Sequence, residues 1–310
     1  MVDFGADVSF AEAEEKIKTH YGVVVPASSI RIITEKHAQI IYNNLDTIQK
    51  KCCQSNDQAV IIAETDGSMV PIVEIKNEAL GDRRKFRITK WSECRLGLAY
   101  SKGSTTPIYG AVFGSVDEAG EELKKVVDLA GRVEKSRIHA VGDGAPWVAD
   151  QIEQKFGDQA NFLLDFYHLS EYLHRAAEYC APESPMAWAT IQKQRMKGAE
   201  ALLVMKELEK YINAQEYSEN SSCPVRTCYN YMLKRTDQFN YKEAIDNDLP
   251  IGSGEIESAH RSVIQKRLKL PGGWWLRTNA QAMASLRVAK ANNAVKEYWA
   301  GYKMSEFVIN

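Results

Sequence analysis

The hydrophobic and polar positions follow a helical period at the start of the chain. Ser9 and Glu12 have the spacing of a capping box, and Phe10, Ala13 and Ile17 recur on one helical face. After the break GVVVP, Ser28 is placed to cap a second helix with the same apolar period. Two helices joined by a short Gly-containing turn are typical of a helix-turn-helix, and also of a plain helical hairpin that packs on the core. In the first case, the residues expected to read DNA are Ser29, Arg31 and Lys36.

The pattern changes to short apolar runs between residues 58 and 165. QAVIIAETDGSMVPIVEI, KWSECRLGLAYSK and TPIYGAVFGSV are rich in β-branched residues, so they predict three consecutive antiparallel strands. An amphipathic helix over 117–133, a strand ending at Asp143, a helix over 145–156 and a last strand, ANFLLDFYHL, follow. This order predicts an α/β fold with a mixed five-stranded sheet flanked by helices.

The rest of the chain is helical in pattern. Roughly ninety residues separate Asp165 from Glu257, far more than a loop needs. Their amphipathic segments predict an all-α insertion. The expected organisation is a helix-turn-helix-like module at 1–50, the first part of the core at 58–168, the insertion at 169–248, and a C-terminal segment at 249–310.

Composition excludes several classes of protein. No apolar run approaches the 18 residues that suggest a membrane span, and the start MVDFGADVSF lacks the regions of a signal peptide. The six cysteines include no C-x-x-C pair, which disfavours a zinc ribbon or a disulfide framework. We therefore expect a soluble cytoplasmic protein with reduced thiols.

Charge is distributed unevenly along the chain. The net charge is −2, whereas residues 258–303 carry nine lysines and arginines against one acid. The stretch IGSGEIESAHRSVIQKRLKLPGGWW places two glutamates at the start of a helix and follows them with cations, a Pro-Gly-Gly turn and paired tryptophans. Carboxylates and cations this close together indicate a site for a metal ion and a polyanion.

Three acidic residues are spaced as the parts of one metal site. Asp66 falls in the first predicted strand and Asp143 follows the fourth, as in the ribonuclease H-like fold, so both are expected at the sheet edge where α/β folds keep their sites. The third acid is Glu257 or, as second choice, Glu255; these lie two apart on a helix, so only one can face the site. Singly, each acid also has an ordinary explanation as a turn, a helix cap or a solvated first-turn residue.

Four blocks of sequence resemble one family. ETDGSMVP, HAVGDGAPWVADQI, LLDFYHLSEYL and IGSGEIESAHRSVIQKRLK with the following GGWW are similar to the blocks of DDE transposases of prokaryotic insertion sequences, of the ISKra group, which is related to Mutator-like transposases. The resemblance covers residues 60–300, and the 8–45 segment also resembles the family's pre-catalytic DNA-binding region. It implies a ribonuclease H-like (RNase H-like) catalytic domain with Asp66, Asp143 and Glu257 as catalytic acids. The residues expected beside that site are Asp165 and His168 in a D-x-x-H pattern, Glu255 and His260.

The expected reaction is metal-dependent cleavage and strand transfer at the ends of an insertion sequence. Two Mg²⁺ ions, for which Mn²⁺ can substitute, would activate the attacking oxygen and stabilise the leaving one. Asp66 is expected to bridge both ions, and Asp143 and Glu257 to complete one each. The insertion at 169–248 is expected to contact the DNA end, to brace the Glu257 helix, or simply to pack.

Double-stranded DNA, as terminal inverted repeats and target, is the expected partner. The cations that follow Glu257 would meet phosphates together with His260, and the tryptophans would stack on an unpaired base, although paired tryptophans beside such a turn are more often core. The residues concerned are Arg261, Lys266, Arg267, Lys269, Trp274 and Trp275.

Two alternatives to a transposase stay open. One is an RNase H-like nuclease without strand transfer, and the other is a catalytically inactive, domesticated DNA-binding protein. The resemblance further implies a homo-oligomer associated with a prokaryotic nucleoid. Because members of the family commonly carry more sequence upstream, an N-terminally short copy is expected to bind DNA ends poorly.

Overall fold

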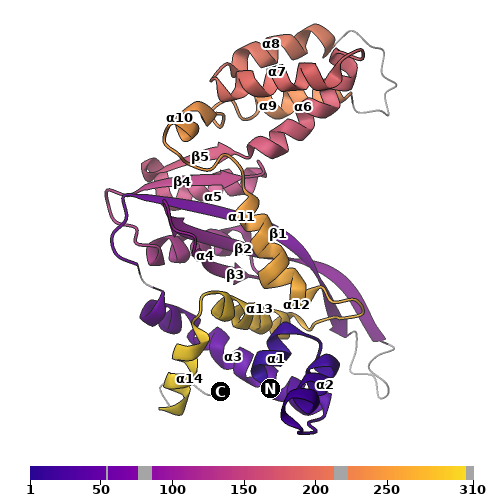
Figure 1. Ribbon diagram of the computed structural model, residues 1–310, viewed down its shortest axis with the longest axis vertical. Coiled ribbons are helices and arrows are strands. Elements are labelled where there is room, and N and C mark those ends of the chain that lie inside the picture. Colours follow the sequence, from indigo (N-terminus) through magenta and orange to yellow (C-terminus); the bar gives the residue numbers. More distant parts are fainter. Residues whose placement is uncertain (54, 76–85, 213–222, 305–310) are drawn as a thin grey trace. The chain divides into compact units, whose positions relative to one another are not determined.

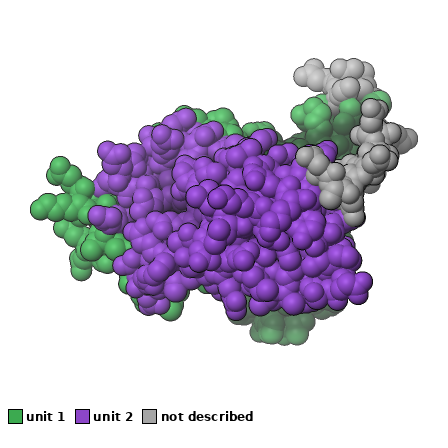
Figure 2. Space-filling view, turned by 90° about the horizontal axis from the view of Figure 1, so that it is seen from above, with its two compact units in different colours: residues 1–136, 255–310 green, residues 137–254 purple. Residues whose placement is uncertain are grey.

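The structure, a computed structural model, describes residues 1–53, 55–75, 86–212 and 223–304 (Figure 1). It divides into two compact units, which are described separately below (Figure 2). The first comprises residues 1–136 and 255–310, and the second comprises residues 137–254. The predicted boundaries at 50, 168 and 248 are not the boundaries of these units.

The first unit joins the N-terminal helices to the three antiparallel strands and the C-terminal helices. Its elements are α1 (Val2–Asp7), α2 (Phe10–Tyr21), α3 (Ala27–Cys52), β1 (Val60–Ile75), β2 (Arg87–Ser101), β3 (Ile108–Val112), α4 (Val116–Leu129), α11 (Gly254–Ala259), the π-helical η3 (His260–Gln265), α12 (Lys266–Leu268), α13 (Arg277–Ala291) and α14 (Val295–Lys303).

The second unit joins two parallel strands to the helical insertion. Its elements are β4 (Arg137–Gly142), α5 (Pro146–Phe156), the 3₁₀ turn η2 (Gly157–Gln159), β5 (Ala160–Leu164), α6 (Phe166–Cys180), α7 (Pro185–Lys197), α8 (Ala201–Ile212), α9 (Pro224–Leu233) and α10 (Tyr241–Asp246). The apolar faces of α6, α7, α8 and α9 form one core with residues of β4, β5 and α10.

The strands form one mixed sheet in the order β3-β2-β1-β4-β5. β1 pairs with β2, and β2 with β3, in antiparallel fashion, whereas β4 and β5 are parallel. Helix α4 contacts β2 and β3, and α5 contacts β4 and β5. The predicted class, an α/β fold with a mixed five-stranded sheet flanked by helices, is therefore confirmed.

The two faces of β1 and β2 meet different partners because side chains alternate along a strand. Leu96 and Leu98 belong to the core that α3 and α13 share, whereas the intervening Gly97 lies against Leu123 of α4. Asp66 pairs in register with Leu96, so it occupies the same face of the sheet as Leu96. This register decides on which side of the sheet the acid lies.

The start of α3 differs from the sequence-based expectation. The helix begins at Ala27, and Ser28 does not cap it. The Ala27 amide instead donates to Glu14 Oε2 at 2.9 Å, so the cap comes from α2. Helix α3 packs on the core through Ile30, Ile40 and Ile48, which are 0–2% exposed. The cap was missed because its acceptor lies thirteen residues away.

Candidate active site

Helices α11 and η3 lie along the β1 face that carries Asp66 (Figure 1). The Ile256 amide donates to Glu64 Oε2 at 2.9 Å, and the His260 ring Nε2 lies 3.0 Å from the Asp66 carbonyl oxygen. Farther along, Gln265 Nε2 donates to Ser68 Oγ at 3.3 Å. Residues 64, 66 and 68 share one face of the strand. Each of them makes one hydrogen bond to the helical segment, at Ile256, His260 and Gln265 respectively.

Glu255 and Glu257 project to different sides of α11. Burial raises the pKa of Tyr100 and of Tyr109, and the carboxylates of Glu64 and Glu255 raise both further. The Glu255 carboxylate is therefore within electrostatic reach of these tyrosines of β2 and β3. Residues two apart on a helix point in nearly opposite directions, so Glu257 projects to a different side of α11, where it pairs with Arg261.

Asp66 is accessible at its carboxylate and fixed at its backbone. Its side chain is 42% exposed, and Oδ1 accepts the Gly67 amide at 2.7 Å. The carboxylate of Glu257 is about two-thirds exposed. Both groups are hard oxygen donors open to solvent, which is the chemistry that Mg²⁺ prefers. Across the described ranges, no three His, Cys, Asp or Glu side chains are gathered closely enough to hold a metal ion.

His260 is a neutral buried residue rather than a surface cation. Its side chain is 3% exposed, and burial lowers its pKa to about 4, against the raising effect of the Asp66 carbonyl. The neutral ring can therefore donate from Nε2 to that carbonyl. Nδ1 is buried without a hydrogen-bond partner among the described residues. The expected phosphate contact from His260 does not agree with this position.

The π-helical segment η3 begins at His260. Such segments insert an extra residue into a helical turn and occur frequently at functional sites. Here Ile256 before the widened turn and Val263 and Ile264 within it belong to one core, and His260 at its start reaches the Asp66 carbonyl oxygen.

The Asp143 loop of the second unit is tightly held. Asp143 is half-buried, and its Oδ1 accepts the Ala145 amide at 2.9 Å. The Tyr231 hydroxyl donates to the Asp143 carbonyl oxygen at 2.8 Å, and Arg235 donates to the Gly144 carbonyl oxygen. The partners of this loop therefore come from α9 and the turn after it, within the predicted insertion.

Asp165 caps α6 and ties it to the segment before α11. Its Oδ1 accepts the amides of Tyr167 and His168, and its Oδ2 accepts the amide and hydroxyl of Ser253. Asp165 is 8% exposed. Because its buried carboxylate accepts four hydrogen bonds, Asp165 has a structural role: it joins the start of α6 to Ser253. The His168 ring lies 5.7 Å from that of Tyr172 and 6.1 Å from that of Tyr231, centroid to centroid.

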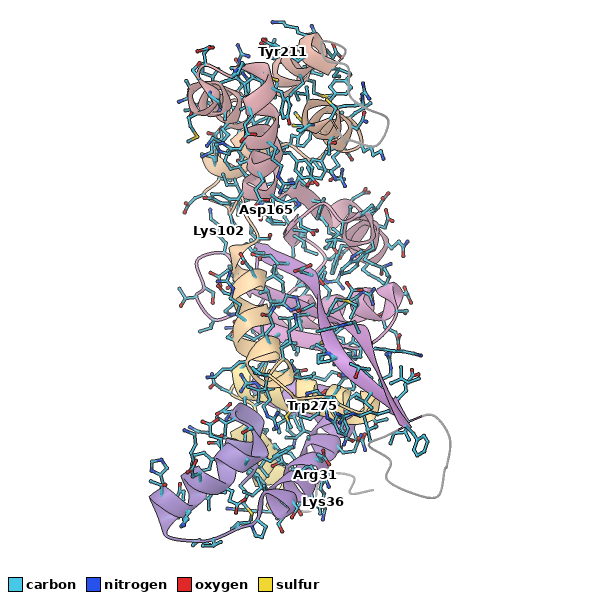
Figure 3. All side chains as sticks on the ribbon, turned by 90° about the vertical axis from the view of Figure 1, so that its right-hand side faces the viewer. Arg31, Lys36, Lys102, Asp165, Tyr211 and Trp275 are labelled. Atoms are coloured by element: carbon cyan, nitrogen blue, oxygen red, sulfur yellow. The ribbon has the colours of Figure 1, made fainter. Side chains whose placement is uncertain are left out.

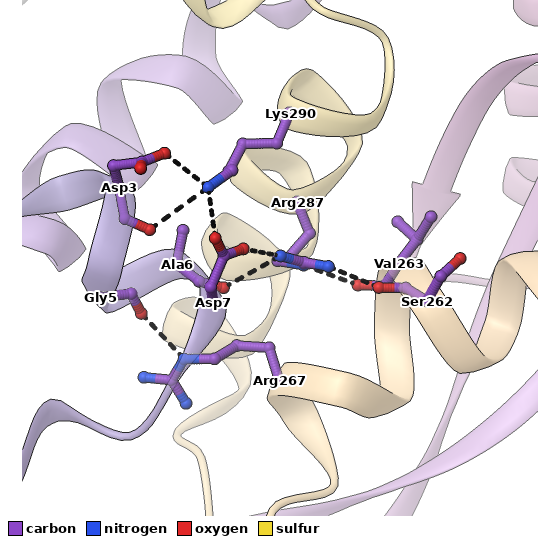
Figure 4. A network of polar contacts seen from close by, with 9 residues as sticks. All are labelled: Asp3, Gly5, Ala6, Asp7, Ser262, Val263, Arg267, Arg287 and Lys290. Atoms are coloured by element: carbon purple, nitrogen blue, oxygen red, sulfur yellow. Dashed lines mark hydrogen bonds and ion pairs between the residues drawn. The ribbon is translucent and has the colours of Figure 1, made fainter. Parts of the chain in front are cut away.

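Three cations of the basic C-terminal segment hold helix α1 (Figure 4). Arg267 Nε donates to the Gly5 carbonyl oxygen at 2.8 Å, and Arg287 Nη1 donates to that of Ala6 at 3.4 Å. Arg287 and Lys290 also pair with Asp7. Arg267 is 4% exposed, and its Cζ atom lies 4.6 Å from the ring centroid of Phe10 and 4.8 Å from that of Trp275. The expectation that Arg267 faces DNA phosphates does not hold, because it satisfies the carboxyl end of a helix instead.

The remaining residues predicted to contact DNA are distributed over the first unit. Arg31 pairs with Glu35, and Arg31 and Lys36 are both exposed on α3 (Figure 3), whereas Ser29 is half-buried. On the α11–α12 helix, Arg261 and Lys266 are exposed and Lys269 is half-buried. These positions leave a role in DNA binding open to test.

The paired tryptophans have different surroundings. Trp275 is 6% exposed, and its carbonyl oxygen accepts the Val73 amide at 2.7 Å, so it belongs to the core. Trp274 is 43% exposed, with the Arg87 guanidinium 5.1 Å from its ring centroid. Of the pair, only Trp274 offers a ring at the surface.

Four residues that hold the candidate acids were not expected from the sequence. They are Glu64, Tyr231, Arg235 and Ser253. Strand alternation alone would have placed Glu64 on the face of Asp66. The other three act over 88 to 91 positions in the chain, and no local pattern reports such partners.

Comparison with known families identifies the chain. Residues 121–300 match the model of the uncharacterised protein family UPF0236. The chain belongs to this family. UPF0236 protein TTE2489 of Caldanaerobacter subterraneus subsp. tengcongensis is 28% identical over 182 residues, 56% of this chain and 37% of the relative. A second UPF0236 protein of that organism, whose name joins eleven locus designations, is 26% identical over 253 residues, 79% of this chain and 49% of the relative.

The chain spans about half of the length of these relatives or less. Among solved structures, the Drosophila P element transposase strand transfer complex aligns over 94% of this chain and 85% of its own, with 11% identity and a TM-score of 0.25. That TM-score is too low to support a fold or a function. No helix in the described part of the chain combines the length and apolar character that a bilayer span requires.

Proposed function

We propose that this UPF0236 protein is the catalytic part of a DNA transposase that cleaves and joins phosphodiesters at the ends of an insertion sequence. One observation carries the proposal. The helix of Glu257 is fixed against the strand of Asp66 through the neutral ring of His260, which donates to the Asp66 backbone. The two solvent-open carboxylates thus come from elements held together by buried contacts, as a preorganised metal site requires.

Two Mg²⁺ ions, or Mn²⁺ in their place, would supply activation of the attacking oxygen and stabilisation of the leaving oxygen. Asp66, Asp143 and Glu257 would hold them as carboxylate ligands of the DDE type. Arg261 forms an ion pair with the Glu257 carboxylate in the structure, and both side chains are about two-thirds exposed. Such a pair is weak, so Arg261 can turn to a DNA phosphate when the carboxylate takes a metal ion.

The eleven locus designations in the name of one relative also support the proposal that this protein belongs to a mobile element. A protein recorded at many loci of one genome has the distribution that an element leaves when it copies itself. The DNA partner would then be the terminal inverted repeats and the target, handled by an oligomer in which two ends are cut together. The sequence resemblance to ISKra-group transposases agrees with this substrate.

The test is strand cleavage of a plasmid that carries the DNA flanking both sides of the gene, with Mg²⁺ and then Mn²⁺. Asp66→Asn, Asp143→Asn and Glu257→Gln are each expected to abolish cleavage and to leave folding and DNA affinity unchanged. Matched controls are the exposed acids Asp57→Asn, Asp150→Asn and Glu15→Gln. Full activity of any one of the first three variants would remove that residue from the site.

Glu255→Gln separates the two glutamates of α11. Because Glu255 and Glu257 point to different sides of α11 and Glu257 is taken as the metal ligand, this substitution is expected to reduce cleavage only mildly. If Glu255→Gln is inactive and Glu257→Gln is active, the assignment on this helix is wrong by two residues.

A further inference from the structure

The loop that carries Asp143 is oriented by the helical insertion. All the residues concerned belong to the second unit. The Tyr231 hydroxyl donates to the Asp143 carbonyl oxygen at 2.8 Å. Arg235 donates to the Gly144 carbonyl oxygen from Nε at 3.1 Å and from Nη2 at 2.5 Å. These bonds fix the two peptide groups that follow the Asp143 Cα atom, and with them the direction of its side chain.

The two donors are themselves held in place. The Arg235 Cζ atom lies 4.1 Å from the centroid of the Tyr231 ring, and Arg235 Nη1 donates to the Tyr231 carbonyl oxygen at 2.9 Å. The same ring stacks on Tyr172 of α6, with centroids 4.1 Å apart and planes 12° apart. Tyr231 is 9% exposed. Its hydroxyl is therefore aimed at the loop before any ligand arrives, which limits the entropy lost on binding.

We propose that Tyr231 and Arg235 are positioning residues for Asp143, through which the helical insertion sets the affinity for the metal ion without contacting it. This inference rests on the proposed function, since it takes Asp143 as a metal ligand. Partners of this kind, one step removed from the metal, typically change metal affinity or activity by about 10–100-fold when they are removed.

Tyr231→Phe and Arg235→Gln test the proposal on the full chain. Tyr231→Phe removes one hydroxyl and keeps the ring that stacks on Tyr172. The matched controls come from α9, the helix of Tyr231: Tyr229→Phe removes a hydroxyl that donates to Glu209, and Arg226→Gln removes a donor to the Ile212 carbonyl oxygen. Arg235→Lys keeps a donor near Gly144 and is expected to recover part of what Arg235→Gln loses.

Four readouts are compared. The Mn²⁺ dissociation constant, from calorimetric titration, is expected to rise about tenfold in Tyr231→Phe and in Arg235→Gln. The Mg²⁺ concentration for half-maximal cleavage should rise in parallel, while metal-free DNA affinity stays that of the wild type. Hydrogen exchange of the amides of residues 143–145 should become faster. The controls should change none of these.

Equal metal affinity and equal loop exchange in Tyr231→Phe and Tyr229→Phe would overturn the inference. Faster exchange with unchanged metal affinity would overturn it too, because the contacts would then only stabilise the fold. If the wild type neither binds Mn²⁺ nor cleaves DNA, the proposed function itself fails. If Asp143→Asn binds Mn²⁺ and cleaves like the wild type, Asp143 is not a metal ligand and the positioning role falls with it.

Discussion

Gly144 shows how closely a single residue fits beside Asp143. Its φ of +85° lies in the left-handed region, which residues with a side chain rarely adopt. A Cβ atom there would lie 2.5 Å from Leu164 Cδ1 and 2.8 Å from both Arg235 Nε and Tyr231 Oη. Both the backbone conformation and the lack of space therefore require glycine, and two of the three atoms in the way belong to the residues that orient the loop.

Gly144→Ala is expected to lower the free energy of unfolding by about 2–4 kcal/mol, because strain at positive φ adds to the overpacking. It should also raise the Mg²⁺ requirement of cleavage. Gly103→Ala is the matched control: its φ is +83°, and nothing lies within 4 Å of its Cβ position. Denaturant unfolding measures both variants. If both variants lose the same free energy of unfolding, Tyr231 and Arg235 move aside for the added methyl group without a measurable loss of stability.

At the scale of elements, α1 depends on partners from α12 and α13. It has six residues, too few for a stable isolated helix. Arg267 and Arg287 satisfy carbonyl groups near its carboxyl end, and Lys290 pairs with Asp3 and Asp7. The high positive charge of this part of the sequence is thus partly committed to packing, and only the remaining cations are candidates for DNA.

Arg287→Gln is expected to lower the free energy of unfolding by about 3 kcal/mol, because it removes one of the two cations that pair with Asp7 and the charged donor to the carbonyl oxygens of Ala6, Ser262 and Val263. DNA affinity and its salt dependence should stay unchanged. Lys296→Gln, an exposed cation on α14, should change stability by less than about 0.5 kcal/mol. Thermal or denaturant unfolding distinguishes the two. A neutral result for Arg287→Gln would mean that α1 is held without any contribution from Arg287.

For the cations that follow Glu257 we expect the opposite: substitutions there should change DNA affinity. Neutralising Arg261, Lys266 and Lys269 together should weaken binding to all DNA sequences alike, and should reduce the slope of log affinity against log salt by about 0.9 for each lost phosphate contact. Substitution of Arg31 or Lys36 should instead weaken binding to element ends more than to random duplex. Titrations at several salt concentrations on both DNAs measure this. An unchanged slope in the triple variant would show that these cations face protein or solvent.

At the scale of the whole molecule, buried histidines make stability depend on pH. Burial lowers the pKa of His37, His139 and His260, in the last case to about 4. Their unfolded pKa is near 6.5, so the unfolded chain takes up protons first as the pH falls. Stability is therefore full above about pH 6.5 and is lost as the pH falls from 6.5 toward 4. For His260 alone the shift corresponds to about 3 kcal/mol.

Unfolding midpoints measured between pH 7 and 4 check this dependence. His37→Gln, at a position packed against Tyr298 and Trp299, should lower stability at neutral pH and flatten the pH profile. His20→Gln, at an exposed position, should leave the profile as it is. A wild-type midpoint that stays constant from pH 6.5 to 5 would contradict the burial of these rings as neutral groups.

The sequence by itself determined the order of the elements and the place of Asp66 within a strand and Asp143 just after one. Those features depend on local alternation, β-branched runs and turn residues, which act over a few positions. The start of α4 at Val116 and of α5 at Pro146 fall within one residue of expectation. Local patterns also place Glu255 and Glu257 in the first turn of one helix.

Only the tertiary structure decided what the charged and polar residues do. Arg261 and Arg267 are alike in sequence, yet one is exposed and the other buried against Phe10 and Trp275. His260 is neutral because of what covers it, and Tyr231 reaches Asp143 across 88 positions. Hydrophobic periodicity is a property of a few neighbouring residues, so the sequence shows it directly. Burial and hydrogen-bond partners depend on which distant segments the fold brings together, so no local pattern could report them.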